Sequence, residues 1–144
     1  MSKHVLIALL LMLALLSACS SQEKGKIQGA DAAPDALPTL AASYSVNGVD
    51  PRGTDYGGNL QVRPGAAPGT YALQWIITGS IQEGFGQVQG NQLLVHWRTV
   101  DDIGLDVTGL TTYTITTEGE LYGPRTVDGV PGAGEERAFP NPPD

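Results

Sequence analysis

Residues 71–78, Tyr-Ala-Leu-Gln-Trp-Ile-Ile-Thr, decide the fold of this chain. Every second position is a large apolar residue, and this face carries Tyr71, Leu73, Trp75 and Ile77. Alternation of this kind, in a run rich in aromatic and β-branched residues, predicts a strand with one face toward a core. The same alternation recurs at 92–98, again with a tryptophan on the apolar face.

Outward from these two strands, glycine- and proline-containing pairs punctuate the chain at short intervals. They include Asn47-Gly48, Pro64-Gly65, Gly79-Ser80, Gly90-Asn91 and Glu118-Gly119. Such pairs favour tight turns. The segments between them predict further short strands, of which Leu121–Gly123 is restricted by Pro124 and Gly134–Phe139 forms a last edge strand.

No window after residue 43 shows a helical period over ten residues. The sequence therefore predicts an all-β domain: a small antiparallel up-and-down meander of seven or eight short strands, forming a barrel or a curled sheet. A two-sheet β-sandwich is the alternative.

The alternation also predicts the core. The expected inward residues are Val46, Leu60, Val62, Leu73, Trp75, Ile77, Phe85, Leu93, Val95, Trp97, Tyr113, Ile115 and Leu121. These side chains are large, so we expect a small barrel to be packed solid, with a tyrosine hydroxyl as its one evident polar group. An aromatic binding cage is the other interpretation, made of Tyr71, Trp75, Phe85, Trp97 and Tyr113.

The N-terminal residues are expected to be an export signal. Residues 5–16 form an apolar run of a length that suits a signal peptide and is too short to span a bilayer. Leu16-Ser17-Ala18-Cys19 follows, and it resembles the bacterial lipoprotein lipobox. The resemblance implies cleavage of a signal peptide at 1–18 and lipidation of Cys19. Ser20 then favours the outer over the inner membrane of a bacterial cell envelope.

These patterns divide the chain into segments. Residues 19–42 are expected to be a flexible linker after the lipidated cysteine, 43–139 the all-β domain, and 140–144 a disordered tail. The whole chain has 144 residues and a net charge of −7. An acidic chain is a poor partner for nucleic acid. The single cysteine leaves no disulfide once Cys19 is lipidated.

A pattern of glycines and aromatics extends along the domain. It reads Tyr44-x-Val46-x-Gly48-x-x-Pro51-x-Gly53-x-x-Tyr56-x-Gly58, then Tyr71-x-x-x-Trp75, Gly84-x-Gly86, Leu93-x-Val95-x-Trp97, Tyr113, Gly119-x-Leu121-x-Gly123 and Gly134-Glu135. This resembles a group of small exported bacterial proteins labelled fibronectin-binding or avidin- and lipocalin-like. The resemblance implies a β fold unit without catalytic residues. Members commonly carry a tryptophan where Arg125 stands, and this departure implies an edge-like or distorted last strand.

Acidic residues offer two candidate sites. Asp101, Asp102 and Asp106 could hold a hard cation through carboxylate oxygens, but their spacing matches no EF-hand loop, and a solvated acidic loop is the simpler interpretation. Glu135 and Glu136 could act as an acid/base pair, but neighbours in a strand point to opposite faces.

Two further features are weak signals. His96 is expected to face away from the Trp97 side, and one histidine cannot form an ordinary zinc site. The turn Arg52-Gly53-Thr54-Asp55 has the composition of an adhesive loop, although chance turn composition explains it better. We therefore expect no enzyme and no cofactor.

The function predicted from the sequence is an interaction or structural module, anchored to the membrane through Cys19 and facing an envelope or extracellular protein. A small-molecule-binding barrel of the avidin or lipocalin kind is the alternative.

Overall fold

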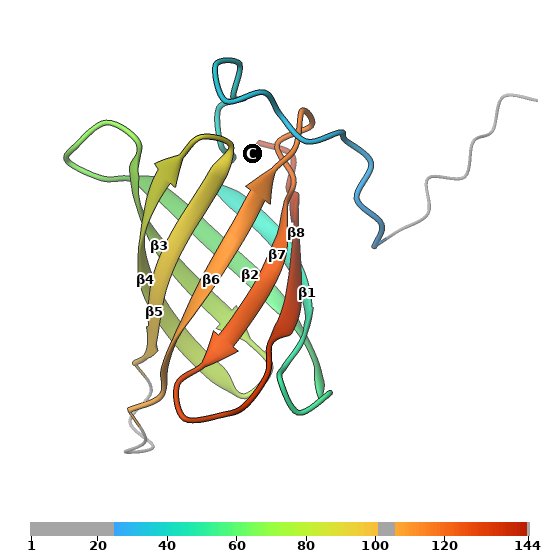
Figure 1. Ribbon diagram of the computed structural model, residues 1–144, viewed down its shortest axis with the longest axis vertical. Helices are drawn as coiled ribbons and strands as arrows, with labels where there is room; N and C mark the ends of the chain where they lie inside the picture. Colours follow the sequence, from blue (N-terminus) through green and yellow to red (C-terminus); the bar gives the residue numbers. More distant parts are fainter. Residues whose placement is uncertain (1–24, 101–105, 144) are drawn as a thin grey trace, which may run out of the picture.

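The computed structural model describes residues 25–100 and 106–143, and these form a closed barrel (Figure 1). Its strands are β1 (Ser43–Val49), β2 (Asp55–Pro64), β3 (Thr70–Ile77), β4 (Ser80–Gln89), β5 (Gln92–Thr99), β6 (Thr108–Ile115), β7 (Leu121–Val127) and β8 (Gly134–Pro140). Each strand pairs antiparallel with the next, and β8 returns to β1. The predicted up-and-down meander is therefore confirmed, with eight strands closed into a barrel.

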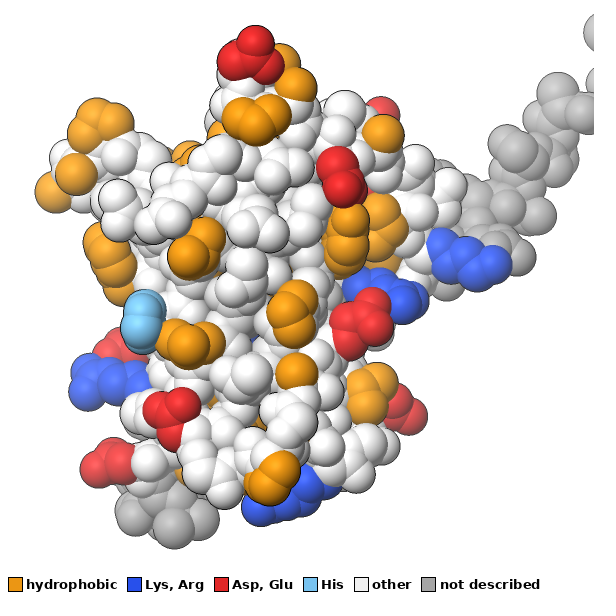
Figure 2. All heavy atoms as spheres, viewed as in Figure 1, with side chains coloured by type: hydrophobic (Ala, Val, Ile, Leu, Met, Phe, Trp, Pro, Cys, Tyr) orange, Lys and Arg blue, Asp and Glu red, His pale blue; other side chains and the backbone are white. Residues whose placement is uncertain are grey.

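The core follows the predicted alternation at most positions. Eleven of the thirteen expected inward residues are buried and a twelfth, Ile77, is partly buried against them. On the face shown in Figure 2, apolar side chains are scattered among polar ones. The burial of these residues shows that one face of each strand points into the barrel, as the alternation of side chains along a strand requires.

Phe85 is the exception, because its side chain lies on the outside of the barrel and is 56% exposed. Gly84 and Gly86, on either side of it, face inward instead. A Cβ on Gly84 would lie 3.0 Å from the Trp75 ring, and one on Gly86 would lie 2.9 Å from Leu93. The prediction that Phe85 faces inward is therefore wrong: large side chains of neighbouring strands fill the space that β4 leaves inside.

The last two strands also differ from the prediction. β7 continues through Pro124 to Val127, and β8 pairs with both β7 and β1, so it is not an edge strand. Pro124 faces outward, and the pairing between β7 and β6 is interrupted next to it. The register of the two strands is the same before and after this interruption. A proline lacks the N–H that a ladder needs, but the strand tolerates one missing bond here.

Residues 25–42, which we call the strap, lie against one end of the barrel (Figure 1). The Ala32 N–H donates to the Ile115 carbonyl at 2.9 Å, Asp31 forms a β-bridge with Thr116, and Leu37 and Leu40 pack against the core. This part of the expected linker is thus attached along its length.

At the C-terminus, Pro140 ends β8 and the Asn141 N–H donates to the Ser43 carbonyl at 2.9 Å. The ordered chain therefore extends past the predicted boundary at residue 139. Within the described residues, no helix is long and apolar enough to cross a membrane.

Candidate functional site

The two ends of the barrel differ in character. The strap covers one end. The other, which we call the loop end, carries the connections 50–54, 78–79, 100–107 and 128–133. Polar side chains point into the barrel within three residues of a strand terminus at this loop end. They are Tyr56 on β2, Gln82 on β4, Arg125 on β7 and Glu136 on β8.

Glu136 is the centre of this cluster and is fully buried. Its carboxylate accepts hydrogen bonds from the Trp75 Nε1–H at 3.0 Å, from the Tyr56 hydroxyl at 2.6 Å and from the Tyr113 hydroxyl. Arg125 Nη1 adds a charge-assisted bond at 3.3 Å. A carboxylate has about four acceptor positions. Four donors therefore saturate it.

Arg125 lies between the two tryptophans of the chain. Its guanidinium carbon is 4.8 Å from the centroid of the Trp75 ring and 4.3 Å from that of Trp97. One edge of the guanidinium bonds Glu136, and Nη2 donates to the Gln82 side-chain oxygen. Stacking on aromatic faces and pairing with a carboxylate together make a buried cation tolerable.

Trp97 contributes the one buried side-chain donor that has no partner among the described residues. Its side chain is 4% exposed, and Nε1 lies within hydrogen-bond reach of no acceptor there. The ring packs on the backbone of Gly109, where a Cβ would lie only 2.6 Å from Trp97 Cζ2. Leaving a buried donor unsatisfied costs about 1–3 kcal/mol, so this N–H favours pairing with a hydrogen-bond acceptor.

The cluster perturbs the tyrosines that contact it. Burial, followed by the negative charge of Glu136, raises the pKa of Tyr113 well above its ordinary value. The same two causes, in the same order, raise the pKa of Tyr56. Both phenols therefore remain protonated and act as donors to Glu136 at neutral pH.

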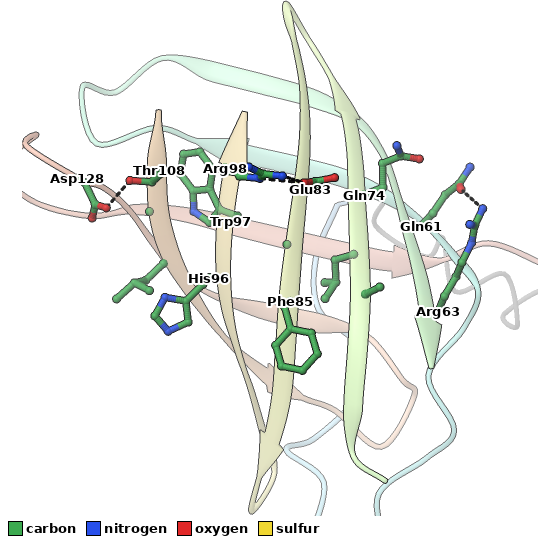
Figure 3. A pocket seen from close by; sticks show the side chains of 15 residues that line it. Gln61, Arg63, Gln74, Glu83, Phe85, His96, Trp97, Arg98, Thr108 and Asp128 are labelled. Carbon is green, nitrogen blue, oxygen red and sulfur yellow. Dashed lines mark hydrogen bonds and ion pairs between the residues drawn. The ribbon is translucent and has the colours of Figure 1, made fainter. Parts of the chain in front are cut away.

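A concave region lies on the outer wall over β2 to β6, a groove of about 590 Å³ (Figure 3). Register places the outward residues of adjacent strands in a row across its floor: Ala72, Phe85, His96 and Leu110. A polar row runs beside it, in which Arg98 Nε donates to Glu83 at 2.8 Å. The groove is open, and its apolar row ends at Leu110, which is 44% exposed.

The structure separates the sequence-predicted candidates. Glu135 is exposed and Glu136 buried, so the adjacent carboxylates do not form a pair. His96 faces outward as expected, between Phe85 and Leu110. Asp101 and Asp102 lie outside the described residues. Across the part that is described, no cluster of three or more His, Cys, Asp or Glu residues could hold a metal ion.

The turn at Arg52–Asp55 and the lipidation site have separate outcomes. Asp50 Oδ1 accepts the N–H groups of Arg52 at 2.9 Å and Thr54 at 2.8 Å, and the turn joins neither the buried cluster nor the groove. Cys19 lies outside the described residues, so its predicted lipidation stays a prediction.

The aromatic set is divided as well. Trp75, Trp97 and Tyr113 meet at the buried cluster, whereas Phe85 is on the outer wall and Tyr71 is half-buried. The sequence prediction missed Glu136, Arg125 and Gln82 as interior residues. The period of two, continued from Leu121 through Arg125 and from Gly134 through Glu136, was the signal that could have placed two of them.

Comparisons with known proteins agree with the fold. No protein-family model and no curated protein matches the sequence. Similar solved structures include a redesigned β-barrel, mFAP1, bound to DFHBI, with 14% identity, a TM-score of 0.54, and coverage of 69% of this chain and 91% of that one. Another is EF1p2_mFAP2b bound to DFHBI, with 15% identity, a TM-score of 0.53, and coverage of 69% and 90%. At this identity, the likeness shows a shared small β-barrel.

Proposed function

We propose that this chain is a small-molecule-binding β-barrel whose ligand lies inside the loop end. The observation that carries the proposal is the buried Trp97 N–H, which has no acceptor among the described residues and lies beside the stacked guanidinium of Arg125. The interior of an eight-stranded barrel has two uses: its own side chains fill it, or it holds one small ligand. That two similar barrels were solved with a small molecule bound supports the second use here.

Binding suits this interior better than catalysis. Glu136 is held by four donors and Arg125 is stacked between two rings, so neither is free to exchange a proton with a substrate. A general base needs an open position toward the group it deprotonates. Fixed, satisfied polar groups with one open donor instead orient a bound molecule.

The proposal is tested by capture of a small molecule. The protein is incubated with a small-molecule extract of its source cells, re-isolated and denatured, and the released compounds are identified by mass spectrometry. The matched control is Val127→Trp, because Val127 is a partly buried apolar residue at the loop terminus of β7. We expect a compound enriched on the wild type and absent from the folded control. Equal recovery from both folded proteins would rule the proposal out.

A second candidate function is an interaction module, for which the outer groove gives a specific reason. Phe85 and Leu110 leave apolar surface exposed on either side of His96. Aromatic side chains exposed in a row are typical of contact surfaces. In that case Phe85→Ser would abolish binding of an envelope protein without affecting capture of a small molecule.

We also propose that the chain is a lipoprotein of the bacterial envelope, on the strength of Leu16–Cys19 alone. A diacylglycerol on the cysteine supplies the two chains that stable anchoring needs. Metabolic labelling with palmitate tests this: the wild type should take up label and Cys19→Ala should not. An unlabelled wild type would remove the anchor, leaving the barrel proposal intact.

A further inference from the structure

Inside the loop end, one buried hydrogen-bond donor, the Trp97 indole N–H, has no partner among the described residues. The indole groups of Trp75 and Trp97 and the guanidinium of Arg125 can only donate. Against them stand the Glu136 carboxylate, already accepting from four residues, and the Gln82 carbonyl, which accepts from Arg125. Any group that completes the cluster therefore has to accept a hydrogen bond.

The unpartnered donor is also in a positively biased position. Trp97 stacks on the Arg125 guanidinium at 4.3 Å, and the negative charge of Glu136 is shared among that guanidinium and three neutral donors. An acceptor that carries negative charge gains from the nearby cation, whereas a cationic group is repelled by it.

We infer that the ligand presents a carboxylate or carbonyl oxygen to the Trp97 indole N–H, beside Arg125. This inference rests on the proposed binding function and names the chemical class of its ligand. A cationic or purely hydrocarbon ligand leaves the Trp97 donor unsatisfied and is selected against. The site thus discriminates by the polarity of one group rather than by size alone, because an unpaired buried donor is costly.

Nuclear magnetic resonance of the indole groups provides the test. The chain has two tryptophans, so the ¹⁵N-labelled protein gives two indole N–H signals, and Trp97→Phe assigns them. The probes are benzoate and benzylammonium, which share a ring and differ in the sign and hydrogen-bonding role of the attached group. We expect benzoate to shift the Trp97 signal and benzylammonium to leave it unchanged. The Trp75 signal, held by Glu136, should barely respond to either.

Trp97→Phe serves also as the matched variant, because it keeps an aromatic ring at this position and removes the indole N–H. It should lower benzoate affinity by about 10- to 100-fold, as expected for a hydrogen bond to a charged group. Affinity that is unchanged by this substitution would contradict the inference.

The remaining outcomes separate the inference from the function on which it rests. Equal shifts with both probes would keep small-molecule binding and overturn the choice of an acceptor. A long-lived water still bound to the Trp97 N–H at saturating benzoate would overturn that choice too. If neither probe binds, the captured compound replaces them, and one without an oxygen acceptor refutes the inference alone. An empty capture experiment would remove the binding function as well.

Discussion

Trp75 and Phe85 are aromatic residues on paired strands whose side chains lie on opposite sides of the barrel wall. Trp75 is fully buried, bonds Glu136 and packs beside Gly84, whereas Phe85 is more than half exposed. We expect Trp75→Ala to lower the free energy of unfolding by about 3–5 kcal/mol, since it leaves a large cavity. Phe85→Ala should change it by about 0.5 kcal/mol or less. Chemical denaturation measures both, and equal losses would contradict this placement of the two rings.

Arg125 and Glu136 should depend on one another. Arg125→Leu leaves the buried carboxylate without its cation, and Glu136→Gln leaves the guanidinium without its anion. Each single change is expected to cost about 3–5 kcal/mol, because an uncompensated charge stays buried. The double variant has a neutral interior, so it should cost clearly less than the two singles together. A double-mutant cycle from denaturation midpoints gives the coupling, and simple additivity would argue against a buried ion pair.

The buried tyrosines predict instability at high pH. Burial raises the pKa of Tyr44 to about 12, and burial with the nearby Glu136 charge raises the pKa of Tyr56 and Tyr113. Above pH 10 the unfolded chain therefore loses phenolic protons that the folded chain keeps. The free energy of unfolding should therefore not change with pH below pH 10. Above pH 10 it should fall by up to about 1.4 kcal/mol per pH unit for each tyrosine. Denaturation midpoints from pH 8 to 12 check this, and a flat profile would contradict it.

Residue-level prediction from the sequence worked where alternation was regular and failed where glycine entered. Trp75 and Trp97 lie on unbroken alternating runs, and both face inward as predicted. In β4, the aromatic side chain of Phe85 suggested that this position faces inward. In the structure, the inward positions are those of Gly84 and Gly86. The buried polar cluster was missed because Glu136 and Arg125 were taken for surface residues, and only closure of the barrel brings their partners together from five other strands.

Among the elements, the strap depends on the side chain of Glu120 for the attachment of its N-terminal part. The Glu120 carboxylate accepts the N–H of Gln28 at 2.9 Å and of Gly29 at 2.8 Å, and it also accepts the Thr116 hydroxyl at 3.0 Å. This attachment could not be predicted from the sequence, because these contacts join residues about 90 positions apart.

Glu120→Ala is therefore expected to release residues 25–29 from the barrel without unfolding it, while Ala30 and Ala32 keep their backbone hydrogen bonds to the barrel. Amide hydrogen exchange at Gln28 and Gly29 should accelerate by at least tenfold, since each loses a charged acceptor. The matched control is Glu118→Ala, two residues away in the same connection and exposed. If both variants protect these amides as the wild type does, Glu120 does not hold the strap.

At the scale of the whole molecule, closure gives every strand two neighbours and leaves no edge. A closed barrel exposes no strand edge that could pair with another chain and start aggregation. With a single cysteine in the sequence, this barrel closes without a disulfide bond within the chain. The strap covers one end, and the polar cluster lies at the other. The sequence predicted the meander but not this difference between the ends, which depends on side chains far apart along the chain.

We propose the loop end as the place for a ligand, and one measurement tests that proposal most directly. With methyl-labelled protein and the captured compound, nuclear Overhauser effects report which methyl groups the ligand contacts. We expect contacts with Val127 and Val95, which face the interior, and none with Leu110 or Ile81, which face outward. Contacts confined to Leu110 and its neighbours in the outer groove would contradict an interior site.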